Sequence, residues 1–67
     1  MISARNQFKG KIKTVKLGEV MAEVVVQVGD LEVVAAITRT SAENLKLQPG
    51  DVVTAVIKAT EVMIAKE

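Results

Sequence analysis

Apolar and polar residues alternate along several short stretches of this chain, which is the pattern of half-buried β-strands. Over residues 7–13 an apolar face lies opposite a lysine face: Phe8, Gly10 and Ile12 against Lys9, Lys11 and Lys13. After a break at Gly18, a second run covers residues 19–28 and places five apolar residues on one face: Val20, Ala22, Val24, Val26 and Val28. The two stretches predict the first two strands.

Gly29 and Asp30 follow directly, and a Gly-Asp pair between two β-rich runs is typical of a two-residue hairpin loop. A third strand is therefore predicted over residues 31–37. Both of its faces are apolar except near the start, with Leu31 and Val33 on one face and Glu32 and Val34 on the other. A strand of this kind is usually covered on both sides.

The alternation stops at residues 38–50. We expect Thr40 or Ser41 to cap one short helix over residues 42–47, and Pro49-Gly50 to end it in a turn. Alternation resumes over residues 51–59 and 61–65, which predicts a fourth strand and a short fifth. This element order is typical of a small OB-type barrel, so we predict an all-β fold: one domain, residues 1–67, forming a five-stranded OB-type barrel with one short helix between strands 3 and 4.

Composition adds an expectation of self-association. A chain of 67 residues buries only about 60% of the surface that its unfolded form exposes. It has no cysteine and no histidine, which excludes disulfides and argues against a zinc site. Because 49% of the residues are hydrophobic, more than one small core encloses, we expect part of them to face a partner subunit.

Charge and residue types argue against several functions. Nine basic and eight acidic residues leave a net charge of +1, which is too small to attract a polyanion, and Phe8 is the only aromatic residue on which a base would stack. Without histidine or cysteine, no nucleophile stands beside a base, so we expect no enzyme activity. The N-terminus has no apolar signal core, and no run approaches the ~20 apolar residues of a membrane span, so we expect a cytoplasmic protein.

Three polar stretches remain as candidate chemistry. Each has an ordinary structural explanation: Arg5 in a polar lead-in that forms a surface ion pair, hydroxyls at residues 38–41 that cap a helix, and Lys58 as a solvated strand lysine. Together, however, a guanidinium, a group of hydroxyls and an ammonium are the donors that surround a small oxyanion.

The segments SARNQFKGKI, ITRTSAENLKLQPGD and VIKATEVMIA, in this order and at these spacings, closely resemble the molbindins, the small molybdenum-pterin-binding (Mop) family. The resemblance covers almost the whole chain. It extends to the molybdate-binding domains of molybdenum-responsive regulators and to accessory domains of molybdate transporter ATPases. It implies an OB-type barrel that assembles as a homohexamer, a trimer of dimers, and binds molybdate or tungstate at subunit interfaces.

The resemblance also implies a site shared between subunits, in which residues of one chain meet those of another around the oxyanion: Ser3, Ala4 and Arg5 with Thr38, Ser41, Lys58 and Ala59. Arg5 and Lys58 would supply charge, and the two alanines would act through their backbone. Ala59 stands where related domains carry serine, so one side-chain donor is missing here. For a second class of site, Lys16 and Lys66 are weaker candidates, and both are equally explained as solvated lysines.

We therefore expect a non-enzymatic store or buffer of molybdate, and also of tungstate, without a catalytic cofactor or a bare metal site. With only Phe8 available for stacking, we expect the free oxyanion and not a pterin as ligand. A nucleic-acid-binding OB-type module and a purely structural oligomer remain alternatives, as does an accessory domain of a transporter or regulator. Met1 ahead of SARNQ, and the lack of a trailing linker, favour a free-standing protein.

Overall fold

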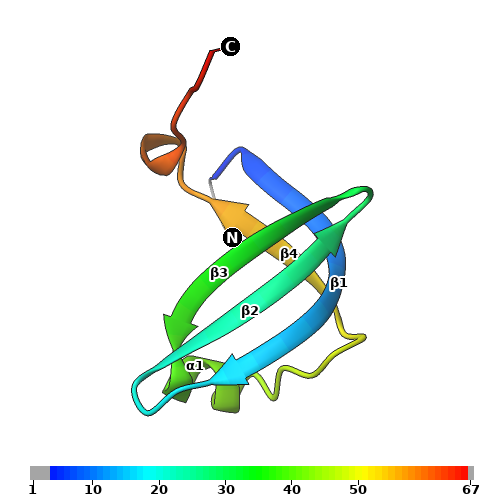
Figure 1. Cartoon of the computed structure of the whole chain (residues 1–67), viewed down its shortest axis with the longest axis vertical. Helices are drawn as coiled ribbons and strands as arrows, with labels where there is room; N and C mark the ends of the chain where they lie inside the picture. Colours follow the sequence, from blue (N-terminus) through cyan, green and yellow to red (C-terminus); the bar gives the residue numbers. More distant parts are fainter. Residues whose placement is uncertain (1–3, 67) are drawn as a thin grey trace.

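The computed structural model describes residues 4–66 and consists of one antiparallel sheet with a short helix at one end (Figure 1). Its elements follow in the order β1 (Asn6–Leu17), β2 (Met21–Val28), β3 (Leu31–Thr38), α1 (Arg39–Asn44), β4 (Val52–Ile57) and the 3₁₀ turn η1 (Ala59–Glu61). The strands lie in the order β3-β2-β1-β4. The all-β class and the single short helix between strands 3 and 4 are confirmed.

Strand β1 is long because it belongs to two ladders. Its first half pairs with β4 and its second half with β2, and Lys11 pairs with both Gln27 and Val52. Gly10 lies at this overlap. A Cβ built there would fall on the carbonyl oxygen of Gln27 and lie 2.9 Å from Cγ2 of Val28. Glycine therefore permits the close approach of β2 at the place where the sheet curls.

The predicted first strand ended at residue 13, whereas β1 continues to Leu17. The difference comes from a β-bulge, because the pairing register with β2 shifts between Ile12 and Thr14. A bulge adds one residue to one strand and reverses which positions face the core. Val15 consequently packs against the core cluster that contains Ile12, although simple alternation places the two residues on opposite faces.

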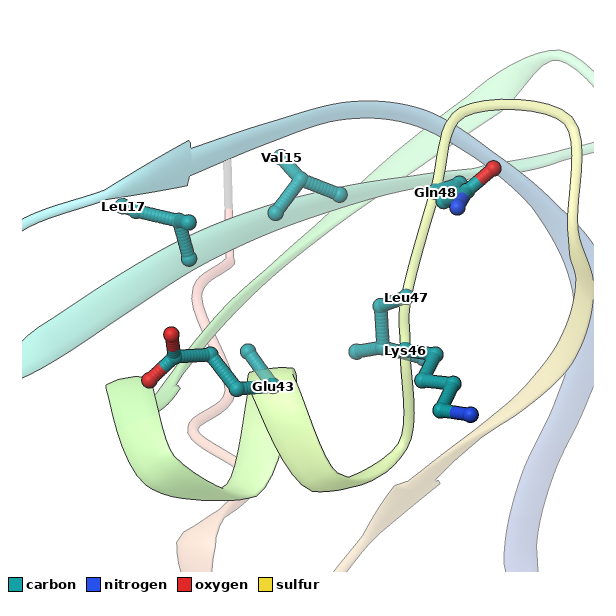
Figure 2. Close-up of a pocket in the computed structure, with 7 residues that line it drawn as sticks. Val15, Leu17, Glu43, Lys46, Leu47 and Gln48 are labelled. Atoms are coloured by element: carbon teal, nitrogen blue, oxygen red, sulfur yellow. The ribbon is translucent and has the colours of Figure 1, made fainter.

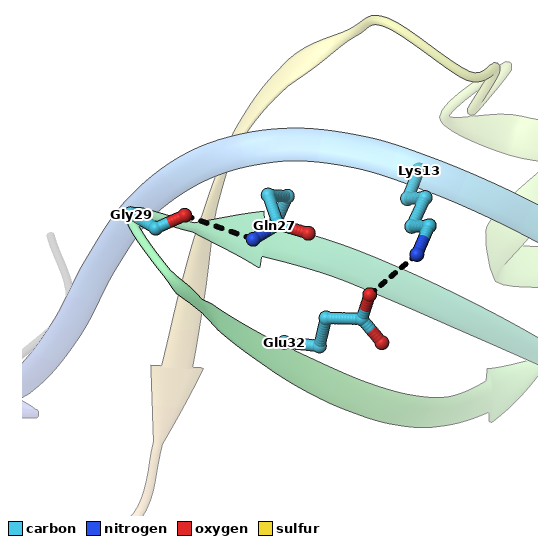
Figure 3. A network of polar contacts seen from close by, with 4 residues as sticks. All are labelled: Lys13, Gln27, Gly29 and Glu32. Carbon is cyan, nitrogen blue, oxygen red and sulfur yellow. Dashed lines mark hydrogen bonds and ion pairs between the residues drawn. The ribbon is translucent and has the colours of Figure 1, made fainter.

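The predicted hairpin is confirmed. Val28 pairs with Leu31 across Gly29 and Asp30, and Gly29 has the positive φ of +57° that such a loop requires. The Gln27 side-chain amide donates to the Gly29 carbonyl at 2.8 Å (Figure 3). Nearby, the Lys13 ammonium lies 2.5 Å from the Glu32 carboxylate, an exposed ion pair across the sheet.

The core is small and lies on the concave face. Ile12, Val24 and Val26 form its centre, with partly buried neighbours from β3, β4 and the segment after the helix. The outer face of β3 stays open, since 62% of Val34 is exposed. The expected cover on both faces of the third strand is therefore not supplied within the described chain.

The prediction of the helix cap was wrong. Helix α1 begins at Arg39, and Thr38, the last residue of β3, caps it by accepting a hydrogen bond from the Ser41 amide at 3.1 Å. Thr40 and Ser41 lie inside the helix, which ends at Asn44 and not near residue 47. Thr38 serves as the cap because its extended backbone (ψ 147°) ends the strand immediately before the first helical residue.

The predicted fifth strand and closed barrel are not confirmed in the described residues. In residues 4–66, no strand follows β4: the chain forms η1 and then runs away from the sheet (Figure 1). An alternating apolar segment forms a strand only where its backbone pairs with a neighbouring strand. Residues 62–66 pair with no strand in the described chain. Met63 and Ile64 are 92% and 90% exposed. No helix in the described residues has the length and apolar character needed to cross a membrane.

Candidate functional site

Arg5 and Lys58 are brought together by the pairing of β1 with β4. Asn6 pairs with Ile57 as the last pair of this ladder, so Arg5 and Lys58 occupy the neighbouring positions just beyond it. Both are exposed, and neither forms an ion pair with any residue in the range 4–66. The expected surface ion pair of Arg5 is therefore not found there. Like charges at such neighbouring positions are destabilising unless an anion binds between them.

The segment before β1 is shaped by Gln7. Its side-chain amide donates to the Ala4 carbonyl at 2.6 Å and closes a bend around Arg5. This bond occupies the carbonyl oxygen of Ala4, a group that would repel an oxyanion. Gln7 therefore fixes the bend that carries Arg5, a contact that only the structure reveals. Ser3 lies outside the described residues.

Thr38 and Ser41 form a hydroxyl pair at the start of α1. The Thr38 hydroxyl donates to Ser41 Oγ at 2.7 Å while its oxygen accepts from the Ser41 amide. Since the hydrogen of Thr38 is used in this pair, the hydrogen of the Ser41 hydroxyl remains available for a ligand. Both residues are exposed. Of the two predicted hydroxyl donors, Ser41 thus keeps a hydroxyl hydrogen that Thr38 does not use, and Thr38 orients the Ser41 side chain.

Lys58 and Ala59 lie where the chain leaves β4. Lys58 precedes η1, and its side chain makes no capping hydrogen bond there. The first amides of such a turn, those of Ala59 and Thr60, have no carbonyl partner within the turn. Ala59 has no side-chain hydroxyl, so its backbone amide is the donor that it offers.

Within one chain these two groups of residues stay apart. Thr38 and Ser41 lie at the start of α1, where β3 ends, whereas Arg5 and Lys58 lie where β1 begins and β4 ends (Figure 1). In the part of the chain that is described, no hydrogen bond or ion pair joins the two groups. A single chain therefore presents the predicted site residues in two separate groups, and Lys58 lies with Arg5 and not, as the resemblance implied, with Thr38 and Ser41.

A groove lies between α1 and the end of β1 (Figure 2). Val15, Leu17 and Leu47 give it apolar walls, and its two charged residues, Glu43 and Lys46, are of opposite sign. The two charges offset each other, and apolar walls offer an oxyanion no hydrogen bonds. The groove is therefore a poor site for a dianion, unlike the positions around Arg5 and Ser41. None of the described residues forms a cluster of three or more metal-ligating side chains.

The chain is similar to proteins that are named for molybdenum or molybdate binding. Residues 2–64 match the TOBE domain. The chain is 52% identical over 64 residues to molybdenum-pterin-binding protein 3 of Clostridium pasteurianum, covering 94% of each protein. Its fold matches the crystal structure of a molybdate-binding protein from Sporomusa ovata with a TM-score of 0.93 and 45% identity, over 98% of both chains.

A second solved structure is that of the cytoplasmic molybdate-binding protein ModG, in a form with molybdate bound. The match has a TM-score of 0.83 and 38% identity, and it covers 88% of this chain and 43% of ModG. The similarity therefore extends to proteins longer than this one. The chain belongs to the molybdenum-pterin-binding (Mop, or molbindin) family and carries its TOBE domain over residues 2–64.

Proposed function

We propose that this protein binds molybdate, and also tungstate, and that it stores or buffers these oxyanions in the cytoplasm without catalysing a reaction. Residues 1–67 act as one molybdate-binding domain in this proposal. The observation that carries it is the pairing register of β1 and β4, which sets Arg5 beside Lys58 with no carboxylate partner in the described residues. Relatives named for molybdenum or molybdate binding support it.

The proposed site lies between copies of the chain. Arg5 with Ala4 on one side, and the Ser41 hydroxyl oriented by Thr38 on the other, are the half-sites that two subunits bring together, with Ser3, Lys58 and Ala59 completing the donor set. We propose a homohexamer, a trimer of dimers, as the assembly. The exposed apolar residues of the described chain, such as Val34 on β3, support self-association.

A site built only of donors favours molybdate over phosphate. Molybdate is a tetrahedral dianion that accepts hydrogen bonds on every oxygen. Hydrogen phosphate carries a proton for which such a site has no acceptor, and a buried unpaired donor costs about 1–3 kcal/mol. Sulfate carries no such proton, so size must exclude it. Its shorter bonds leave its oxygens farther from a cage of short hydroxyls and amides, where hydrogen bonds weaken.

Nucleic-acid binding remains the alternative for an OB-type fold, and no structural observation favours it. Phe8, the only aromatic residue, is 41% exposed and stands alone. Retention on a column of single-stranded DNA at physiological salt would speak for this alternative.

The test of the proposed function is a calorimetric titration with molybdate, run beside sulfate and phosphate at equal ionic strength. We expect strong heat from molybdate alone. Arg5→Ala removes a charge-assisted hydrogen bond of about 1.5–3 kcal/mol, so the affinity should fall roughly tenfold to a hundredfold. Lys9→Ala is the matched control, since it removes an exposed lysine from the middle of β1. Unchanged molybdate affinity in Arg5→Ala would show that the site is misplaced.

A further inference from the structure

Arg39, the first residue of α1, connects the helix to the turn between β1 and β2 (Figure 1). Its backbone amide donates to the Val20 carbonyl at 2.8 Å, and Nη1 of its guanidinium donates to the Gly18 carbonyl at 3.1 Å. The amide of Gly18 donates to the Met21 carbonyl at 2.8 Å and closes the same turn. The main chain and the side chain of one residue thus hold the start of α1 against this turn.

The ladder between β2 and β3 brings the hydroxyl pair of Thr38 and Ser41 to the same place. Met21, directly after the turn, pairs with Thr38 in the last pair of that ladder. Thr38 caps α1, and its hydroxyl donates to Ser41 Oγ at 2.7 Å. Because Arg39 lies between these two residues in the chain, its contacts with the turn fix the backbone that joins them.

Helix α1 needs such an anchor because it is only six residues long and buries only Ala42. An isolated helix of this length is not stable in water, so contacts outside the helix must hold its first turn. Glu43 assists from one turn further along, since its Oε1 lies 3.5 Å from Nε of Arg39 in an i,i+4 pair. The two side chains are 41% and 55% exposed, so the pair adds little to global stability and acts on the direction of the guanidinium.

A guanidinium so near to Thr38 and Ser41 would also suit direct contact with an oxyanion, but its surroundings argue against that role. Nη1 already donates to the Gly18 carbonyl, and Nε faces the Glu43 carboxylate. A carboxylate at this distance would repel an anion placed on the same guanidinium. Arg39 is therefore placed to orient the hydroxyl pair and not to contact the ligand.

We propose that Arg39 is a positioning residue of the molybdate site, which holds the first turn of α1 against the β1–β2 turn so that the Ser41 hydroxyl keeps its direction. The inference rests on the proposed function and deepens it, because Arg39 is not among the predicted donors. Without this anchor the first turn of α1 frays, and the hydroxyl pair loses its fixed geometry.

A double-mutant cycle on molybdate affinity separates positioning from direct contact. We expect Arg39→Ala to weaken binding about three- to tenfold, at most the loss of one neutral hydrogen bond. In the Ser41→Ala background the same substitution should change the affinity less than about twofold, because the donor that it orients is already absent. Additive losses, or an unchanged affinity in Arg39→Ala, would overturn the proposal.

Two further variants show whether geometry or charge is responsible. Arg39→Lys keeps the charge but loses the planar fork of donors, so it should bind molybdate as weakly as Arg39→Ala. Lys13→Ala is the matched control and should keep the wild-type affinity. It removes a cation from the exposed pair with Glu32, which lies about 20 Å from Thr38 along β3. Wild-type affinity in Arg39→Lys would show that charge suffices and would overturn the proposal.

A measurement without molybdate keeps this test independent of the proposed function. Three-bond couplings to the γ-methyl carbon of Thr38 report its χ1 angle, and we expect one rotamer in the wild type. Arg39→Ala should average these couplings while the far-UV circular dichroism of the sheet is retained, and Lys13→Ala should leave them unchanged. Wild-type couplings in Arg39→Ala would overturn the positioning role. A wild-type protein that gives no heat with molybdate would instead contradict the proposed function, on which the couplings do not depend.

Discussion

At the residue scale, Thr38 combines two tasks that sequence patterns usually assign to different residues. It ends β3, and its hydroxyl both caps α1 and donates to Ser41 at 2.7 Å. Donating to Ser41 leaves the Ser41 hydrogen free, so the helix cap also determines which hydroxyl can contact a ligand. Gln7 also determines local geometry through one hydrogen bond: its side-chain amide donates to the Ala4 carbonyl and thereby shapes the bend at Arg5.

The two hydroxyls should therefore respond differently to mutation. Ser41→Ala removes the free donor and should weaken molybdate binding about tenfold, with little effect on thermal stability. Thr38→Val removes the cap, which costs about 0.5–2 kcal/mol of stability, and it also weakens binding because Ser41 is no longer oriented. Calorimetric titration and thermal unfolding of both variants measure the two effects. Thr38→Ser should restore both properties, and an equal loss of stability in Ser41→Ala would contradict these roles.

At the element scale, β1 organises the molecule. Its two halves pair with β4 and β2, its bulge turns Val15 toward the core, and its beginning carries Arg5 next to Lys58. The bend depends on the absence of a side chain at Gly10, where β2 approaches most closely. The hydrophobic pattern indicated a strand here, but the pattern alone does not reveal a strand shared between two ladders.

Gly10→Ala tests this bend. The added methyl group would meet the Gln27 carbonyl and the Val28 side chain, so the sheet must open locally. We expect a loss of about 1–3 kcal/mol in the free energy of unfolding, the usual cost of overpacking. Urea unfolding measures it, with Lys9→Ala as the neighbouring surface control, which should change stability by less than about 0.5 kcal/mol. Equal stability of Gly10→Ala and wild type would show that the bend does not need glycine.

At the scale of the whole molecule, one chain is incomplete. Its described residues leave Leu31, Val34 and Met63 at least 62% exposed, and the proposed half-sites lie at separate places on its surface. The proposed assembly therefore rests on one feature: apolar surface and oxyanion donors are both left without partners in the described residues. Association of copies would satisfy both at once.

Molybdate should accordingly stabilise the assembly. A ligand that binds only the folded, associated form adds about 2.7 kcal/mol when its concentration is a hundredfold above the dissociation constant. We expect the melting temperature to rise with molybdate concentration, and dilution to dissociate the protein less readily when molybdate is present. Sulfate serves as the ionic control, and Arg5→Ala should reduce the rise because it weakens molybdate binding. An identical melting temperature with and without molybdate would contradict a shared site.

The local pattern of the sequence was sufficient for much of this architecture. Alternation located β2 and most of β3 and β4, and Gly29-Asp30 located the hairpin, because period-two burial and positive φ are properties of a few adjacent residues. The family motifs likewise named Arg5 and Lys58, and the register of β1 with β4 makes them neighbours. The donor types that suit an oxyanion were readable in the same way.

Only the tertiary structure decided features that depend on distant residues. The bulge after Ile12 is a matter of register with β2, and the choice of Thr38 as cap depends on where β3 ends. Residues 61–65 alternate like a strand, yet they pair with nothing in the described chain, because strand formation needs an edge that sequence alone does not supply. The residue types and their spacing thus determine the local chemistry. Strand pairing depends on the fold of the whole chain, and so does the separation of the two proposed half-sites.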